Sequence, residues 1–193
     1  MQPPAVGETH STTVTFTQRD FDEFARLSGD VNPIHVDPEF SARTTFGRTV
    51  AHGMALFGVL DATTARWLDT PLATVRQELM FTAPTFTGEA VTVDLAAIST
   101  SGEVIEVAQR MTRPDGVQTC VGSTRVGGEA SAPEGGSVAA EPGPGFRGLE
   151  VAMSAEMTRS YSAADIAAYV GLIDDPNPSY QGSDAVVPPP LLG

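Results

Sequence analysis

The feature that most constrains this chain is the stretch AHGMALFGVLDATTARWL at residues 51–68. Its apolar side chains fall on most sides of the helix that the stretch predicts, instead of on one stripe. Such a helix is stable only when other elements cover it on several sides. We therefore expect a fold in which a sheet, or a partner subunit, encloses one long helix.

Strand-like segments before and after that helix can supply the covering sheet. Residues 8–16 predict a first strand, and strands are also predicted at 72–81, 89–99, 103–112 and 117–126. Turn signals separate the later strands, and this spacing is typical of an antiparallel sheet. We expect a meander of these four strands and an α+β fold, with the sheet wrapped around the long helix.

Residues 17–29 predict a shorter helix with clear signals at both ends. Thr17 and Asp20 have the spacing of a capping box, and Gly29 suits the left-handed residue that ends a helix. One face should be buried, because apolar residues recur at helical spacing at Phe21, Phe24 and Leu27.

Residues 30–50 are predicted to form a long polar loop. Pro33 and Pro38 should keep its backbone out of regular helix, apart from one short turn around 37–44.

The second part of the chain repeats a pattern from the first. A segment rich in Gly, Pro and Ala at 128–148 predicts a linker. After it, residues 161–178 align without a gap on 16–33, and 186–193 resemble 49–56. We interpret this as a duplicated supersecondary unit.

The domain organisation expected from this pattern is one complete domain at 1–127, the linker, and an incomplete second copy at 149–193. The second copy lacks the long helix and strands that would bury its apolar face. We expect it to be mobile or to dock loosely on a neighbour, with the chain a fragment or the product of a truncated gene.

Composition excludes several classes of partner. The net charge is -13 and no Lys is present, so nucleic-acid phosphates are poor partners. The first residues do not resemble a signal peptide, and no stretch is long and apolar enough to span a membrane. The single Cys120 excludes an internal disulfide, and the scattered histidines lack metal-ligand spacing. We expect a cytoplasmic protein without a metal.

A group of polar residues with chemical potential lies between the two helices. Asp30-Val31-Asn32-Pro33-Ile34-His35 is followed by Ala51-His52-Gly53 at the start of the long helix. An Asp and a His on a proline-stiffened loop can converge on one water as base and acid. The N–H of Gly53, at a helix N-terminus, suits a negatively charged oxygen.

With its context, from FARLSGDVNPIHVDPEFSARTTFGRTVAHGM through the later strands, this pattern resembles the MaoC-like dehydratase family, the (R)-specific enoyl-CoA hydratases of hotdog fold. The resemblance covers residues 8–127. It implies reversible hydration of trans-2-enoyl thioesters to (3R)-3-hydroxyacyl thioesters, carried on coenzyme A or acyl carrier protein, with no other cofactor. It also implies that Asp30 and His35 flank the catalytic water, Asn32 orders the loop and Gly53 binds the thioester carbonyl.

The same resemblance implies a homodimer or pairing with another hotdog subunit. The second copy departs from the motif, because Tyr180 replaces the His and Pro188-Pro189-Pro190 replaces Ala-His-Gly. Pro190 has no N–H to donate, so we expect this copy to be inert.

Two alternatives remain open. A hotdog thioesterase would direct water at the thioester carbonyl, but it would not need His35 beside Asp30. A non-catalytic hotdog subunit of a dehydratase complex would suit the degenerate second copy but not the intact first motif.

Other polar and aromatic residues have ordinary explanations. His52 should orient the helix start, and His10 is expected to be incidental. Asp61 falls on an apolar helical face, which we attribute to a solvated edge of the helix. Trp67 and Cys120 are expected in the core. Three arginines could attract a carrier's phosphates, although they are more typical of solvated surface: Arg43, Arg48 and Arg76.

Overall fold

The computed structural model describes residues 4–69, 74–127, 158–182 and 185–192. In chain order its elements are β1 (Thr9–Thr15), α1 (Gln18–Ser28), α2 (Pro33–Val36), α3 (Pro38–Ala42), α4 (Gly53–Leu68), β2 (Thr74–Phe81), β3 (Ala90–Ser101), β4 (Val104–Thr112), β5 (Gln118–Val126), α5 (Ala163–Ile173), the 3₁₀ helix η1 (Pro178–Tyr180) and α6 (Pro189–Leu192). The predicted strands and the two predicted helices of the first domain are confirmed. None of the described helices is long and apolar enough to cross a membrane.

The strands form one antiparallel sheet in the order β1-β3-β4-β5-β2. The predicted four-stranded meander is wrong in one strand, because only β3, β4 and β5 pair in succession. β2 instead pairs with β5 at the far edge. After β2, the chain forms an isolated bridge between Val50 and Phe86 and then enters β3 beside β1. Alternation of apolar residues determines which face of a strand is buried, but it does not specify the neighbouring strand.

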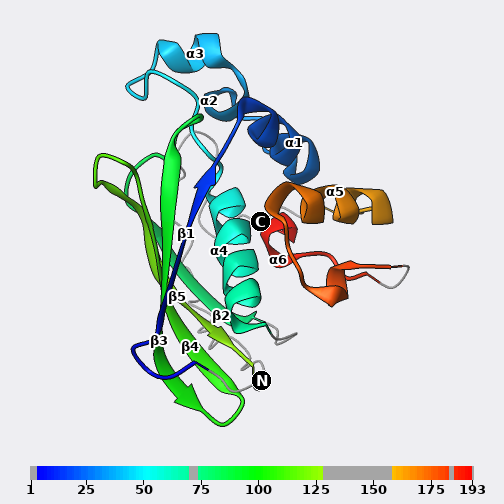
Figure 1. The fold of residues 1–193 in the computed structure, drawn as a ribbon. Coiled ribbons are helices and arrows are strands. Elements are labelled where there is room, and N and C mark those ends of the chain that lie inside the picture. Colours follow the sequence, from blue (N-terminus) through cyan, green and yellow to red (C-terminus); the bar gives the residue numbers. More distant parts are fainter. Residues whose placement is uncertain (1–3, 70–73, 128–157, 183–184, 193) are drawn as a thin grey trace, which may run out of the picture.

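The long helix α4 lies at the centre of the molecule. Figure 1 shows the sheet curving along one side of α4, with α5 and α6 on the other side. Leu60 and Ala62 of α4 are fully buried, as are Val93 and Val107 of the sheet. The expected enclosure of this helix is therefore confirmed, but elements from the end of the chain supply part of it.

Both predicted end signals of α1 are present. The Thr17 side chain accepts from the Asp20 N–H and the Asp20 carboxylate accepts from the Thr17 N–H, which is a capping box. Gly29 ends the helix with φ 78°, a conformation that costs little for glycine.

The segment 30–50 contains more helix than expected. Pro33 and Pro38 each occupy the beginning of a short helix, α2 and α3. The prediction that these prolines prevent helix is therefore wrong. The first helical residues have no intrahelical acceptor for their N–H, so proline is well tolerated there.

The described part of the second copy, residues 158–182 and 185–192, reproduces the local structure of the first. Ser162 and Asp165 form a capping box on α5, as Thr17 and Asp20 do on α1. Asn177 caps η1 as Asn32 caps α2. The linker 128–148 and residues 149–157 lie outside the described residues.

The second copy packs firmly on the first domain, contrary to the expected mobility or loose docking. Tyr169 of α5 is fully buried, and Ile173 and Leu191 belong to the same apolar cluster as the α4 residues. Tyr169 fits against Gly58 of α4, where any Cβ would lie 2.5 Å from the tyrosine oxygen. The apolar face that the second copy cannot bury by itself is buried on α4 of the same chain.

Candidate active site

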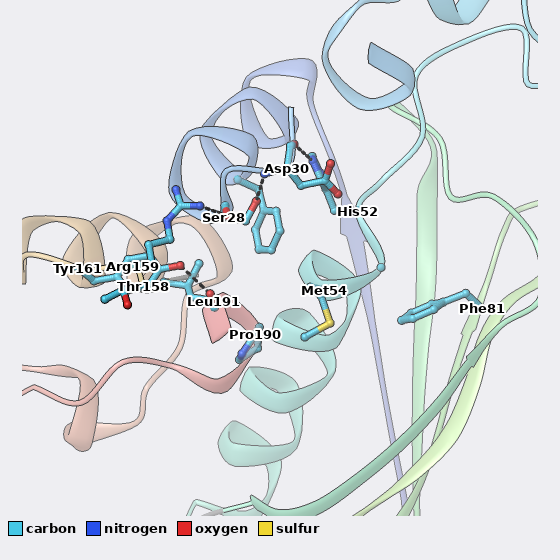
Figure 2. A pocket seen from close by; sticks show the side chains of 12 residues that line it. Ser28, Asp30, His52, Met54, Phe81, Thr158, Arg159, Tyr161, Pro190 and Leu191 are labelled. Carbon is cyan, nitrogen blue, oxygen red and sulfur yellow. Dashed lines mark hydrogen bonds between the residues drawn. The ribbon is translucent and has the colours of Figure 1, made fainter. Parts of the chain in front are cut away.

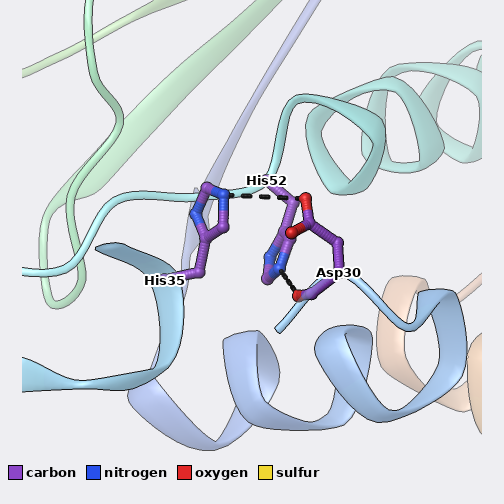
Figure 3. A group of neighbouring side chains, drawn as sticks. All are labelled: Asp30, His35 and His52. Atoms are coloured by element: carbon purple, nitrogen blue, oxygen red, sulfur yellow. Dashed lines mark hydrogen bonds and ion pairs between the residues drawn. The ribbon is translucent and has the colours of Figure 1, made fainter. Parts of the chain in front are cut away.

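The structure brings Asp30 and His35 together at the end of α1. Asp30 Oδ2 lies 3.8 Å from His35 Nε2. His35 is buried, whereas the Asp30 side chain is 55% exposed. Figure 3 shows both side chains pointing toward each other beside His52. The spacing of the two groups leaves room for them to share one water molecule.

Short-range hydrogen bonds set the orientation of the loop that carries this pair. Asp30 Oδ1 accepts from the Asn32 N–H at 3.2 Å, and Asn32 Oδ1 accepts from the Ile34 N–H at 3.2 Å. These bonds start α2, and α2 presents His35 to Asp30. Asn32 therefore has a position that agrees with its predicted ordering role.

The second ring nitrogen of His35 determines which atom can exchange a proton. His35 Nδ1 lies 2.7 Å from the carbonyl oxygen of Val50. A carbonyl oxygen only accepts, so Nδ1 carries a hydrogen and donates it. The exchangeable proton of His35 is consequently on Nε2, which faces the Asp30 carboxylate.

His52 contacts both members of the pair through the Asp30 backbone and the His35 ring. Its Nε2 donates to the backbone oxygen of Asp30 at 2.9 Å, and its ring stacks on His35 with centroids 3.8 Å apart. Burial lowers the pKa of His52, and the neighbouring His35 acts in the same direction. A neutral His52 can hold the Asp30 backbone without repelling a protonated His35.

Gly53 is the first residue of α4, and His52 makes no side-chain capping bond there. The first N–H groups of a helix have no intrahelical acceptor and carry partial positive charge. The Gly53 N–H is thus placed where a helix N-terminus could bind an oxyanion, and its role stays a prediction. A Cβ at this position would lie 2.9 Å from the Phe81 ring, so the ring rests directly on the glycine.

A cavity of about 600 Å³ opens at this site. The first domain contributes Asp30, His52, Gly53, Met54 and Phe81 to its lining. Figure 2 shows that the opposite wall comes from the second copy, through residues that include Tyr161, Pro190 and Leu191. His35 is buried and is not among the lining residues.

The sequence did not predict the second-copy wall or the Phe81 contact. The alignment of 186–193 on 49–56 is the one sequence feature that could have indicated the second-copy wall. In this alignment Leu191 and Met54 occupy equivalent positions in the two copies.

One group of described residues has metal-ligand composition. Ligand atoms of Asp30, His35 and His52 all lie within 4.8 Å of one another. The two imidazole planes are inclined by only 25° and are stacked. Imidazole lone pairs lie in the ring plane, so stacked rings direct them past each other instead of toward one ion. This geometry fits a proton-exchanging pair better than a metal centre.

The structure also shows how far three other residues discussed from the sequence are buried. Asp61 is buried, so the prediction of a solvated helix edge is wrong. It accepts from Thr74 Oγ1 at 2.5 Å, and burial raises its pKa to about 6. Cys120 is buried as expected, and burial raises its pKa to about 12. Trp67 is partly buried, and its ring stacks on His10.

Two of the three candidate carrier-binding arginines form ion pairs within the first domain. Arg48 pairs with Glu89, and Arg76 pairs with Glu78. These contacts favour the structural interpretation of both side chains.

Comparison with known proteins places the chain in a family. The model of the MaoC-like domain matches residues 3–115, more than half of the chain. The chain belongs to the MaoC-like domain family. Among curated relatives of this MaoC-like chain, a 3-hydroxybutyryl-CoA dehydratase from Methylorubrum extorquens is 38% identical over 89 residues, covering 46% of the chain and 57% of that relative. An (R)-specific enoyl-CoA hydratase from Rhodospirillum rubrum is 37% identical over 101 residues, covering 52% of the chain and 68% of that relative. The matches thus span between about half and two thirds of these relatives' lengths.

Solved structures support the hotdog fold of the MaoC-like chain. The (R)-hydratase from Aeromonas caviae, described as involved in PHA biosynthesis, has a TM-score of 0.62 and 28% identity, covering 65% of this chain and 98% of its own. A MaoC-like dehydratase with 16% identity has a TM-score of 0.62 and covers 97% of this chain and 74% of its own. The second likeness concerns fold alone, but it extends into the second copy.

Proposed function

We propose that this MaoC-like chain catalyses the reversible hydration of trans-2-enoyl thioesters to (3R)-3-hydroxyacyl thioesters. The observation that carries the proposal is that Asp30 Oδ2 lies 3.8 Å from His35 Nε2, close to the N-terminus of α4. The names of the relatives from Methylorubrum extorquens and Rhodospirillum rubrum agree with this chemistry. The (3R) configuration is inferred from the name of the Rhodospirillum rubrum relative, an (R)-specific enoyl-CoA hydratase.

In the proposed reaction Asp30 is the base and His35 is the acid. A water between them and the substrate gives its proton to the Asp30 carboxylate, while its oxygen bonds to C3 of the enoyl group. Protonated His35 Nε2 delivers a proton to C2. The proton on Asp30 then passes to His35 and restores the starting state. Dehydration follows the same steps in reverse.

Attack at C3 moves negative charge onto the thioester oxygen. The Gly53 N–H and the dipole of the sixteen-residue helix α4 would stabilise that charge. An oxyanion at this place lies beside Asp30, His52 and Met54, which line the same cavity. The arrangement requires no metal, flavin or nicotinamide, and the thioester carrier is coenzyme A or acyl carrier protein.

A thioesterase is the alternative enzyme on the same fold. It would release free thiol, whereas hydration removes the enoyl double bond and leaves the thioester intact. The purified chain is incubated with crotonyl-CoA while enoyl absorbance and free thiol are followed together. We expect absorbance to fall without thiol release. Thiol release would establish the thioesterase, and no change in either signal would favour a non-catalytic subunit.

Pairing with a second hotdog subunit is part of the same proposal. Two solved structures of similar fold from Mycobacterium tuberculosis are described as complexes, one of them a 3R-hydroxyacyl-ACP dehydratase. Sedimentation analysis of the purified chain distinguishes a dimer from a monomer. Cytoplasmic localisation also belongs to the proposal, and fractionation of cells tests it.

A further inference from the structure

The wall of the cavity opposite the catalytic pair belongs to the second copy. Tyr161, Pro190 and Leu191 line the same cavity of about 600 Å³ as Asp30 and Gly53. Figure 2 shows Met54 between Phe81 and the Pro190–Leu191 corner, with Asp30 and His52 above them. The second copy, although degenerate in its own motif, therefore shapes the space in front of the first copy's site.

Leu191 is held firmly in this position. Its side chain is only 4% exposed and belongs to the apolar cluster that includes Phe24 and Leu56. Tyr161 Oη donates to the Leu191 carbonyl oxygen at 2.6 Å. A side chain anchored through both its packing and its backbone forms a rigid boundary of the cavity.

Additional contacts hold the whole second copy against α1 and α4. Arg159 donates to the Ser28 carbonyl oxygen at the end of α1, and Arg26 of α1 pairs with Asp165 at 3.0 Å. Arg66 of α4 pairs with Asp174 at 2.9 Å. Exposed ion pairs contribute little stability singly, but together they orient α5 on the first domain.

The chemistry at Gly53 determines which way an acyl chain would run. With the thioester oxygen on the Gly53 N–H and C2 and C3 beside Asp30, the chain continues into the cavity that Asp30 lines. Phe24, Met54 and Leu191 line that cavity and would contact the chain there. On the other side of Gly53, beyond Phe81, a second cavity of about 390 Å³ leaves room for the carrier arm.

We propose that Leu191 of the second copy is the specificity-determining residue that ends the acyl subsite and limits the length of the acyl chain. This inference rests on the proposed hydratase function. It assigns the degenerate copy a role in substrate selection, where the sequence predicted an inert remnant.

The test measures kcat/KM of the full chain with trans-2-butenoyl-, trans-2-hexenoyl- and trans-2-octenoyl-CoA. One methylene in an apolar pocket changes specificity by about tenfold or more. Leu191→Ala should therefore raise the octenoyl-to-butenoyl ratio by about tenfold over the unaltered chain, and Leu191→Phe should lower it by about as much.

Two controls separate chain-length selection from a general effect on packing. Leu191→Met has a similar volume and should keep the original ratio. Val186→Ala changes a side chain on the same segment that is 54% exposed and should leave all rates unchanged. If Leu191→Ala does not fold, the Leu191→Phe ratio decides the question.

Equal losses of rate for every chain length, or ratios within twofold of the original in both Ala and Phe variants, would overturn the inference. If either result is obtained while the unaltered chain is active, only the role of Leu191 is contradicted and the proposed hydratase function is not. An unaltered chain that hydrates none of the three substrates would instead contradict the proposed function itself.

Discussion

At the scale of single residues, the opposed carboxylate and imidazole give the most direct prediction. Asp30→Asn keeps an acceptor for the Asn32 N–H but removes the base, and His35→Ala removes the acid. Each should lower kcat with crotonyl-CoA by ~10²–10⁴, the range typical of general acid–base catalysis. Glu39→Gln, an exposed carboxylate of α3, is the matched control and should retain full activity. Normal turnover in either site variant would show that the pair is not catalytic.

The role of the Gly53 N–H can be isolated because Gly53 is the first residue of α4. Proline is tolerated there, and the preceding His52 has ψ 136°, which suits a residue before proline. Gly53→Pro removes the N–H, but it also adds a Cβ against Phe81. Gly53→Ala adds only the Cβ and is the control. We expect kcat of the Pro variant to lie ~10²-fold or more below that of the Ala variant. Equal rates in two folded variants would exclude this donor.

At the scale of elements, α4 carries a buried carboxyl that makes its stability depend on pH. Burial raises the pKa of Asp61 to about 6 from an ordinary value of 3.8. Between these values the folded chain binds more protons at Asp61 than the unfolded chain does. Stability therefore falls as pH rises through this window, by at most about 3 kcal/mol from this group.

Asp61→Asn should remove this pH dependence. The amide oxygen can still accept from Thr74 Oγ1, and no charge is buried. In urea unfolding at about pH 4.5 and about pH 7.5, the variant should lose less stability between the two values than the unaltered chain and should be the more stable at the higher one. Some dependence should persist, because burial also raises the pKa of Asp175. The control Glu103→Gln changes an exposed carboxylate and should show the same pH dependence of stability as the unaltered chain. If Asp61→Asn also showed that unchanged pH dependence, Asp61 would not be its source.

At the scale of the whole molecule, the second copy and the first domain share one apolar cluster through Tyr169, Ile173 and Leu191. Trypsin can cut after Arg147 in the segment predicted to be a linker, because arginine is its recognition residue. We expect the two pieces to co-elute in gel filtration after this cut and to separate only in denaturant, since apolar burial holds them together. If the C-terminal piece were lost under native conditions, the second copy would be only loosely docked on the first domain.

The sequence by itself determined those features that depend on residues a few positions apart. The capping box at Thr17, the end of α1 at Gly29 and the burial of the long helix all follow from local spacing. The pairing of Asp30 with His35 belongs to the same class, because a short loop cannot carry two residues so close in sequence far apart.

Only the tertiary structure decided how distant segments meet. Strand alternation allowed several strand orders, and the placement of β2 beside β5 was not among our predictions. Asp61 became buried because β2 and the second copy pack around α4. Leu191 reached the cavity of Asp30 across a long stretch of chain. These contacts depend on complementary shapes of surfaces that lie far apart in the sequence, and a linear pattern records each surface without recording which one it will meet.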